Sequence, residues 1–112
     1  MNKLRSDHEA IQNRIRELVD KRQINFTLHA QQEMTNDKVK VAELLGMLQA
    51  CTILEDYPDY RRGACCLVGG LTPAGRYLHA VCSSTLPELV IITVYEPKRP
   101  KWETPFQRGK KK

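Results

Sequence analysis

Residues 76–95 read RYLHAVCSSTLPELVIITVY, and this stretch decides the fold. Apolar side chains recur at alternate positions on both sides of a short proline-containing loop, which predicts one strand over residues 76–83 and a second over residues 88–95. If Ser83 pairs with Leu89, one face of this hairpin is wholly apolar and is expected to face the core, whereas a slip of one residue would exchange the two faces. The apolar set is Leu78, Ala80, Cys82, Val90, Ile92 and Val94.

The opposite face of the hairpin gathers side chains that can take part in chemistry. The same pairing brings Tyr77 opposite Tyr95. It also brings His79 opposite Thr93, and a histidine can take up or release a proton near neutral pH. Arg76 begins the first strand directly after a turn that contains proline and glycine, and its planar guanidinium can bind two oxygens of one phosphate. An ordinary turn charge and simple packing within the sheet are the alternatives.

Upstream of this hairpin the sequence changes from a helical to a strand-like period at Cys51. The helices are predicted over residues 7–22, over residues 28–36, and from a cap at residues 36–37 to about residue 50, and the strands over residues 51–57 and 64–68. Ser6 and Glu9 form a capping-box pattern at the start of the first helix, and residues 23–26 are expected to form a short connection. This order predicts an α+β fold, with N-terminal helices packed on one face of a four-stranded antiparallel meander.

Length and composition favour one small domain. The chain has 112 residues, of which 41% are hydrophobic and 28% charged, so it can bury one core. We expect a single domain over residues 1–97 and a basic tail over residues 98–112. The sequence has no apolar run long enough to span a membrane and no apolar N-terminal stretch typical of signal peptides, so we expect a cytoplasmic protein without membrane attachment.

Positive charge is concentrated at the C-terminal end. The chain carries a net charge of +5, while residues 98–112 carry +6 and residues 1–97 carry −1. A basic tail attracts polyanions such as nucleic acid, and an aromatic ring among its cations can stack on a base of single-stranded RNA, a contact worth about 1–3 kcal/mol. The predicted RNA-binding residues are Lys98, Arg99, Lys101 and Trp102. A solvated, solubilising tail is the alternative interpretation.

A second histidine lies on the second predicted helix. His29 and Glu33 are four residues apart and share one helix face, where they can form an oriented pair. A hydrogen bond on the helix surface, or a histidine that holds the helix against the sheet, is the alternative. RNA cleavage without a metal needs a base, an acid and a cation for the phosphate, and His29, His79 and Arg76 are of the residue types suited to these roles.

The four cysteines favour packing over a metal site or disulfides. They lie in apolar runs, and no two have the Cys-x-x-Cys spacing of common zinc sites. They are Cys51, Cys65, Cys66 and Cys82. Reduced thiols packed as small hydrophobes are therefore favoured, and no cofactor is expected. A metal bound by His29, His79 and one cysteine is a less favoured alternative.

Four short motifs stand in order along residues 26–102. They are Phe26-Thr27-Leu28-His29-Ala30 with Met34, Ile53-Leu54-Glu55-Asp56-Tyr57-Pro58, residues 70–76 with Leu78-His79, and Ile92-Thr93-Val94-Tyr95 leading to Pro97 and Trp102. In this order they resemble an uncharacterised bacterial family, domain of unknown function 4258. That family in turn resembles the RelE/ParE-like toxin superfamily.

The resemblance carries expectations about fold, activity and partner. It implies a RelE-like fold of helices followed by an antiparallel sheet, and a ribonuclease-like toxin. It also implies an antitoxin partner of the zinc-finger or DNA-binding type. The chain departs from the family pattern at Glu33 and Asp37, where many relatives have arginine, glutamine or another basic residue, and this departure implies a weaker grip on RNA.

These observations lead to one hypothesis and one alternative. The hypothesis is a metal-free endoribonuclease that cleaves messenger RNA as the toxin of a bacterial toxin–antitoxin system. Its catalytic set would be His29 and His79 for proton transfer, Arg76 for the phosphate, and Tyr95 for orientation. The alternative is a non-catalytic module whose basic tail binds nucleic acid or an acidic protein.

Overall fold

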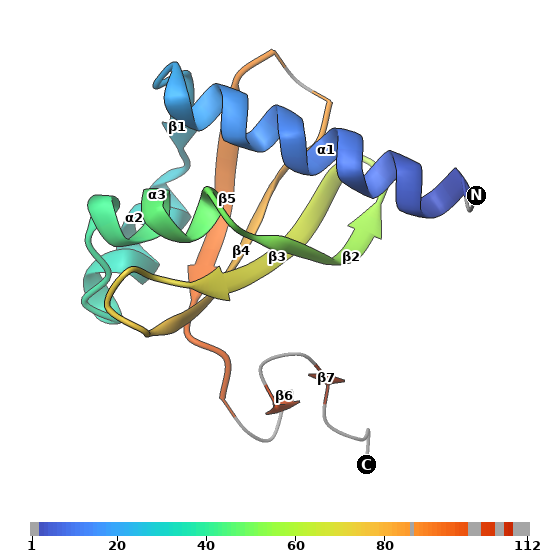
Figure 1. The fold of residues 1–112 in the computed structure, drawn as a ribbon. Helices are drawn as coiled ribbons and strands as arrows, with labels where there is room; N and C mark the ends of the chain where they lie inside the picture. The colour runs from blue at the N-terminus through green and yellow to red at the C-terminus, as the bar shows by residue number, and fades with distance from the viewer. Residues whose placement is uncertain (1–2, 86, 99–101, 105–106, 109–112) are drawn as a thin grey trace.

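The computed structural model describes residues 3–85, 87–98, 102–104 and 107–108, and over these ranges it contains three helices and a five-stranded sheet. The helices are α1 (Lys3–Asp20), α2 (Leu28–Asn36) and α3 (Val41–Leu48). The strands are β1 (Ile24–Phe26), β2 (Thr52–Tyr57), β3 (Cys65–Leu71), β4 (Tyr77–Ser83), β5 (Leu89–Tyr95), β6 (Trp102–Thr104) and β7 (Gln107–Arg108). Figure 1 follows this order along the chain. The predicted α+β class is confirmed.

The main sheet is mixed, with the strand order β1-β5-β4-β3-β2. Strands β2 to β5 form the predicted antiparallel meander. The prediction of four strands was wrong in one respect, because β1 adds a fifth strand that runs parallel to β5, with Ile24 opposite Leu89. Three residues are too few to display an alternating pattern, so residues 23–26 read as a connection. Ile24 and Phe26 nevertheless pack against the core.

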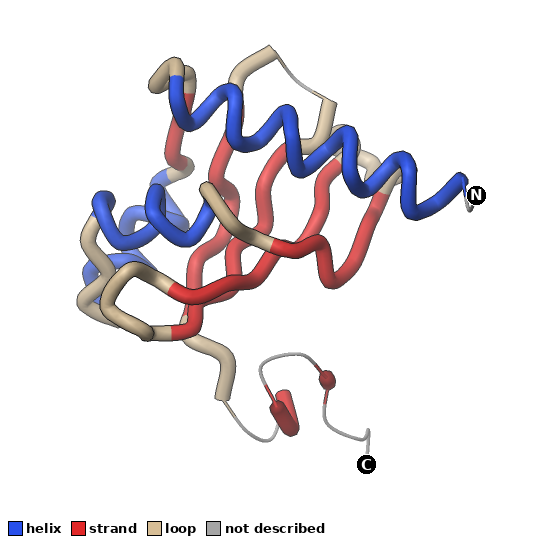
Figure 2. The backbone as a smooth tube through the Cα atoms, viewed as in Figure 1, coloured by secondary structure: helices blue, strands red, loops and turns tan. Residues whose placement is uncertain are grey.

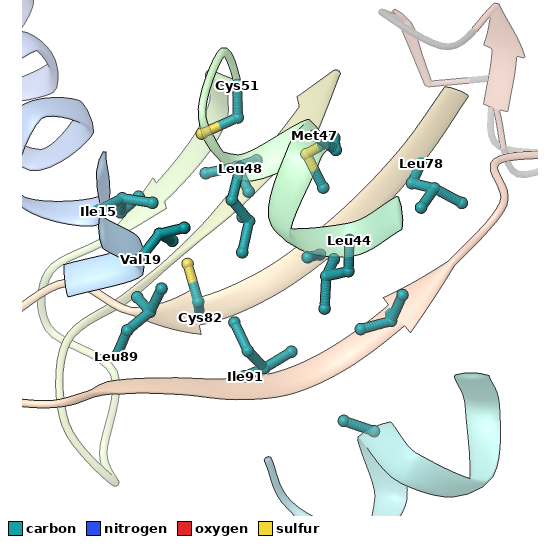
Figure 3. Close-up of a cluster of buried hydrophobic side chains, with 14 of the residues drawn as sticks. Ile15, Val19, Leu44, Met47, Leu48, Cys51, Leu78, Cys82, Leu89 and Ile91 are labelled. Atoms are coloured by element: carbon teal, nitrogen blue, oxygen red, sulfur yellow. The ribbon is translucent and has the colours of Figure 1, made fainter. Parts of the chain in front are cut away.

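Helices α1 and α3 lie over one face of the sheet (Figure 2), and α2 packs against the edge strand segment of β5. Apolar side chains of α1 and α3 meet those of the sheet in a continuous core. Figure 3 shows Ile15 and Val19 of α1, Leu44 and Leu48 of α3, and Ile91 of β5, all fully buried. The burial of each such side chain contributes about 1.5–3 kcal/mol to the free energy of unfolding. This apolar layer therefore stabilises the sheet, whose other face carries the candidate site.

The pairing of β4 with β5 differs from the predicted register. His79 lies opposite Tyr95, and a bulge between Val81 and Cys82 then brings Cys82 opposite Ile91. An extra residue on one strand moves the following side chains to the other face, and an alternating pattern does not reveal where it stands. The core residues of β5 are Leu89, Ile91 and Val94, in place of the predicted Val90, Ile92 and Val94.

Strand β3 continues to Leu71, beyond the predicted end at residue 68. The sequence suggests that Gly69 and Gly70 weaken this end, but both remain in the strand because neighbours approach them closely. A Cβ atom at Gly69 would lie 3.0 Å from Cδ2 of His79, and one at Gly70 would lie 3.2 Å from Cγ of Met47. Glycine inside a strand commonly marks such an approach.

Both ends of the chain differ from the predicted elements. Helix α1 begins at Lys3 and not at residue 7, so the Ser6 and Glu9 pattern lies inside the helix. At the other end β6 and β7 pair in antiparallel fashion within residues 98–112, for which the sequence predicts only a basic tail (Figure 1). Within the described ranges, no helix has the length and apolar character needed to cross a membrane.

Gly46 of α3 packs against the turn between β3 and β4. A Cβ atom at this position would lie 2.6 Å from Cδ and Cγ of Pro73. Alanine usually stabilises a helix relative to glycine by about 1 kcal/mol. Here we expect Gly46→Ala to lower the free energy of unfolding by about 1–2 kcal/mol, because the methyl group forces the helix and the turn apart. Denaturant unfolding measures the change.

A double-mutant cycle isolates this contact. In a Pro73→Ala background, Gly46→Ala is expected to be neutral or stabilising, because the ring carbons that oppose the new methyl group are gone. Equal destabilisation in both backgrounds would contradict the explanation.

Candidate functional site

A buried histidine and a tyrosine meet on the face of the sheet that is turned away from the helices. Leu78 and Ala80 belong to the core, so the side chain of His79 between them points to the other face. His79 is fully buried, and its Nδ1 lies 3.2 Å from the hydroxyl oxygen of Tyr95. Their rings meet edge on, with centroids 5.2 Å apart. His79 therefore pairs with Tyr95, whereas the sequence prediction set it opposite Thr93.

Tyr77 completes this aromatic cluster. Its ring centroid lies 5.7 Å from that of His79, again in an edge-on contact. Gly69 lies opposite His79 on β3, and a Cβ atom there would approach the Tyr77 hydroxyl to 3.0 Å. Burial raises the pKa of the Tyr77 hydroxyl, which therefore stays protonated at neutral pH. Because Gly69 has no side chain, there is room for the imidazole of His79 between the rings of Tyr77 and Tyr95.

The second histidine lies on the exposed side of α2. The side chain of His29 is 64% exposed, and its Nε2 lies 3.3 Å from Oε1 of Glu33, as the spacing of four residues predicts. The same carboxylate oxygen accepts the backbone N–H of Val94 at 2.9 Å. Glu33 therefore orients the imidazole and also bonds α2 to β5.

Thr27 positions the start of α2. Its hydroxyl oxygen accepts the backbone N–H of Ala30 at 3.0 Å, which is the usual N-cap bond. The same hydroxyl donates to the carbonyl oxygen of Ile92, and the backbone N–H of Thr27 donates to that of Ile91, each at 3.0 Å. The helix that carries His29 thus begins on β5, and its orientation depends on that strand.

The polar contacts of the two imidazoles lead to consecutive residues of one strand, Val94 and Tyr95. His29 reaches the backbone of Val94 through Glu33, and His79 reaches the side chain of Tyr95. The carboxyl half of β5 therefore carries both of these contacts. Each imidazole has a different bonded partner, one at the edge of the strand and one on the outer face of the sheet.

Arg76 is bound by acceptors from three segments. Its Nε donates to Glu96 Oε1 at 3.1 Å, and its terminal nitrogens donate to the backbone oxygens of Asp37 and Lys38 at 2.5 and 3.1 Å. The carboxylate of Glu43 lies 3.8 Å from Nη1. The guanidinium, only 25% exposed, thus joins the end of α2, the start of α3 and the residues after β5. A phosphate would have to replace one of these acceptors.

Acidic residues that are not among the predicted site residues complete this region. Glu96 donates its backbone N–H to Oδ2 of Asp37, and Glu43 accepts the backbone N–H of Lys40. Glu33 and Asp37 are the two positions at which the chain departs from the family pattern. Both hydrogen-bond α2 and its C-cap to the end of β5. The available sequence signals were the spacing of Glu33 from His29 and the position of Glu96 near that strand.

The structure describes only part of the predicted RNA-binding tail. Lys98 is exposed. Arg99 and Lys101 lie outside the described residues. Trp102 lies in β6, and only its backbone is described. The proposed stacking platform therefore stays a prediction.

The cysteines are buried free thiols that line the core. The Sγ atoms of Cys66 and Cys82, which face each other across β3 and β4, are 4.0 Å apart. Among the residues that the structure describes, no group of three histidine, cysteine or carboxylate side chains could hold a metal ion. The alternative of His29, His79 and a cysteine around one metal is therefore not assembled there.

Burial also lowers the acidity of two of these thiols, Cys51 and Cys82. It raises the pKa of Cys51 to about 11 from the ordinary value of 9.0. The contact with Cys66 and burial together raise the pKa of Cys82. Thiolates are the reactive form of cysteine, so these buried thiols are expected to be inert at neutral pH.

The raised pKa of Cys51 predicts loss of stability at alkaline pH. Well below pH 9 the thiol is protonated in both states, so its contribution to stability is fully present. Between pH 9 and about 11 the unfolded chain releases the proton while the folded chain keeps it, so the free energy of unfolding falls, by about 2–3 kcal/mol at the upper end. Denaturant unfolding at several pH values measures this. Cys51→Ala is expected to flatten the curve, and an unchanged slope would contradict the assignment.

The fold and its polar contacts define the class of protein. It is a small α+β domain in which strand β5 makes contacts that lead to one histidine on a helix and one histidine in the sheet. Residues 26–96 match the family described as Domain of unknown function (DUF4258), and the chain belongs to this family. The match runs from β1 to the residue after β5 and includes His29, Arg76, His79 and Tyr95. No curated protein and no solved structure matches the chain.

Proposed function

We propose that this protein is a toxin-like endoribonuclease that cleaves messenger RNA by acid–base chemistry without a metal. The supporting observation is that His29 and His79 are bonded to consecutive residues of β5, one through Glu33 and one through Tyr95. The two groups that RNA cleavage needs, one to accept and one to donate a proton, are thus available along one strand.

The geometry favours His29 as the base. Its imidazole is exposed, so it can approach the 2′-hydroxyl of a ribose, and Glu33 stabilises the imidazolium that forms when it takes the proton. The 2′-oxygen then attacks the phosphorus and forms a P–O bond, while the bond from phosphorus to the 5′-oxygen breaks.

The geometry favours Tyr95 as the acid, with His79 behind it. His79 is fully buried and does not meet solvent, whereas Tyr95, whose hydroxyl contacts it, is partly exposed. The phenol gives its proton to the leaving 5′-oxygen, and the imidazole stabilises the phenolate through the hydrogen bond to Nδ1. The products are a 2′,3′-cyclic phosphate and a 5′-hydroxyl. His79 is thus a positioning residue.

The role of Arg76 in this proposal is structural. Its guanidinium already binds Glu96 and the backbone at the end of α2, so it fixes the residues that follow Tyr95. The phosphate needs another cation. Lys98, exposed and three residues after Tyr95, is one candidate within the described part of the chain.

The resemblance to the RelE/ParE-like superfamily adds a biological setting to the proposal. The protein would act in the cytoplasm, and its activity would be held in check by an antitoxin of the zinc-finger or DNA-binding type. Induction of the chain alone should then arrest growth. Coexpression of an antitoxin of this type should relieve the arrest.

The direct test is the incubation of purified, untagged protein with RNA in the presence of a metal chelator. We expect fragments that end in 2′,3′-cyclic phosphate and 5′-hydroxyl groups, which end-labelling and mass spectrometry distinguish from other termini. RNA that stays intact when equimolar protein is present, with and without added ribosomes, would refute the proposal.

The alternative is a binding module without catalysis. The specific observations in its favour are the full burial of His79 and the four acceptors around Arg76, both typical of groups that stabilise a fold. It predicts RNA binding that weakens steeply with salt, is lost when residues 98–112 are deleted, and leaves no cleaved ends.

A further inference from the structure

The loop between β2 and β3 presents an aromatic ring beside two cations. Tyr60 is 55% exposed, although tyrosine rings usually bury much of their surface. Arg61 and Arg62 follow it directly and are also exposed. With Asp59, these side chains line an open hollow of about 610 Å³.

Unlike Arg14, Arg16 and Arg76, the two arginines have no side-chain acceptor in the described part of the chain, a property that they share with the exposed Arg22. Arg14 and Arg16 donate to backbone oxygens, and Arg76 is bound as described above. Over the described ranges, neither Arg61 nor Arg62 makes a hydrogen bond or ion pair through its side chain. Their charges are therefore available to an external anion.

The loop holds these groups in a defined turn. The backbone N–H of Tyr60 donates to the carbonyl oxygen of Tyr57 at 3.3 Å, and the N–H of Gly63 donates to that of Tyr60 at 3.0 Å. Gly63 has a φ of 115°, a conformation that favours glycine and returns the chain to β3. A ligand that binds here meets side chains carried by a hydrogen-bonded turn.

We propose that residues 60–62 bind single-stranded RNA, with Tyr60 stacked on a base and Arg61 and Arg62 on the neighbouring phosphates. An exposed aromatic ring next to unpaired cations is the usual platform for a single strand. The choice of RNA as the ligand rests on the proposed function. From Cys65, which follows this loop, to Gly69, which lies opposite His79, β3 rises about 13 Å, so one strand of RNA can contact both the loop and the Tyr95 pair.

The test compares two variants with the same change in net charge. Arg61→Gln with Arg62→Gln removes the proposed phosphate contacts, and Arg22→Gln with Lys40→Gln removes two exposed cations elsewhere. The probe is a short fluorescent RNA with 2′-O-methyl groups, which cannot be cleaved by attack of the 2′-oxygen. We expect the loop variant to weaken binding about tenfold or more and to lower the salt dependence of log Kd by about 1.4, while the control variant stays within about twofold.

The aromatic contact has its own matched pair. Tyr60→Ala is expected to weaken binding about 5-fold to 150-fold, whereas Tyr60→Phe keeps the ring and should bind as the unsubstituted protein does. Because all of these positions are exposed, the variants should unfold at the same temperature as the unsubstituted protein. Comparison of their thermal unfolding verifies this.

The outcomes separate this inference from the proposed function. If the protein binds the probe through the loop but leaves unmodified RNA intact, cleavage is refuted and the loop assignment stands. If the loop variant binds as tightly as the control variant, or if the unsubstituted protein does not bind the probe, the loop assignment is overturned. Cleavage of unmodified RNA by the loop variant with an unchanged KM would overturn it as well.

Discussion

Replacement of Tyr95 by phenylalanine is expected to slow RNA cleavage by about 100- to 10,000-fold, the usual contribution of a general acid. The substitution removes only the hydroxyl that lies 3.2 Å from Nδ1 of His79. The ring keeps its packing against β4, so we expect the fold to persist with a loss of about 1–2 kcal/mol in the free energy of unfolding. Single-turnover cleavage with saturating protein measures the effect on the chemical step.

The matched control is Tyr57→Phe. This substitution deletes the same atom from a tyrosine whose hydroxyl donates to Glu55 and not to a histidine. It should cleave at the unsubstituted rate, and both variants should bind the 2′-O-methyl probe equally well. Cleavage by Tyr95→Phe at the rate of the control would remove Tyr95 from the mechanism and leave its hydroxyl with a structural role.

Replacement of Arg76 by alanine is expected to lower the free energy of unfolding by about 2–3 kcal/mol. The guanidinium is the common donor to Glu96 and to the carbonyl oxygens of Asp37 and Lys38. Its removal leaves partly buried acceptors without a partner and brings the charges of Glu43 and Glu96 together without compensation. The figure stays below that of a fully buried ion pair because about a quarter of the side chain is exposed to water.

Two further substitutions make this prediction specific. Arg76→Lys keeps one charge but cannot reach acceptors on several sides, so we expect it to recover less than half of the loss. Arg61→Ala removes an exposed arginine without acceptors and should change stability by less than about 0.5 kcal/mol. Urea unfolding followed by circular dichroism compares the three. Equal stability of Arg76→Ala and Arg61→Ala would contradict a structural role for Arg76.

The sequence predicted most of the fold because its two strongest patterns were local. Apolar side chains at alternate positions indicated β4 and β5, short apolar runs indicated β2 and β3, and the helices have regular apolar spacing. Strand β1 escaped prediction because its partner β5 lies more than 60 residues later in the chain, and three residues carry no period of their own. The bulge near Cys82 escaped for a different reason, since an extra residue alters pairing without a change in composition.

The candidate site was predictable in its residue types and less so in its contacts. The spacing of His29 and Glu33 revealed that pair, but the second partner of Glu33, the backbone of Val94, carries no side-chain signal. Arg76 shows the same limit, because two of its acceptors are backbone oxygens whose direction depends on how α2 ends. In both Glu33 and Arg76, the contacts that the sequence did not reveal are hydrogen bonds to the main chain of a distant segment.

The bonds of Thr27 and Glu33 to β5 have a further consequence, for association between molecules. An edge strand with open backbone groups invites pairing with a strand from another chain, and the route can lead to aggregation. Strand β1 covers β5 only over Leu89 to Ile91. Beyond it, a hydroxyl binds the carbonyl oxygen of Ile92 and a carboxylate binds the N–H of Val94. Two side chains, one from the N-cap of α2 and one from the helix itself, therefore protect the remaining edge of β5 against pairing with a strand of another molecule.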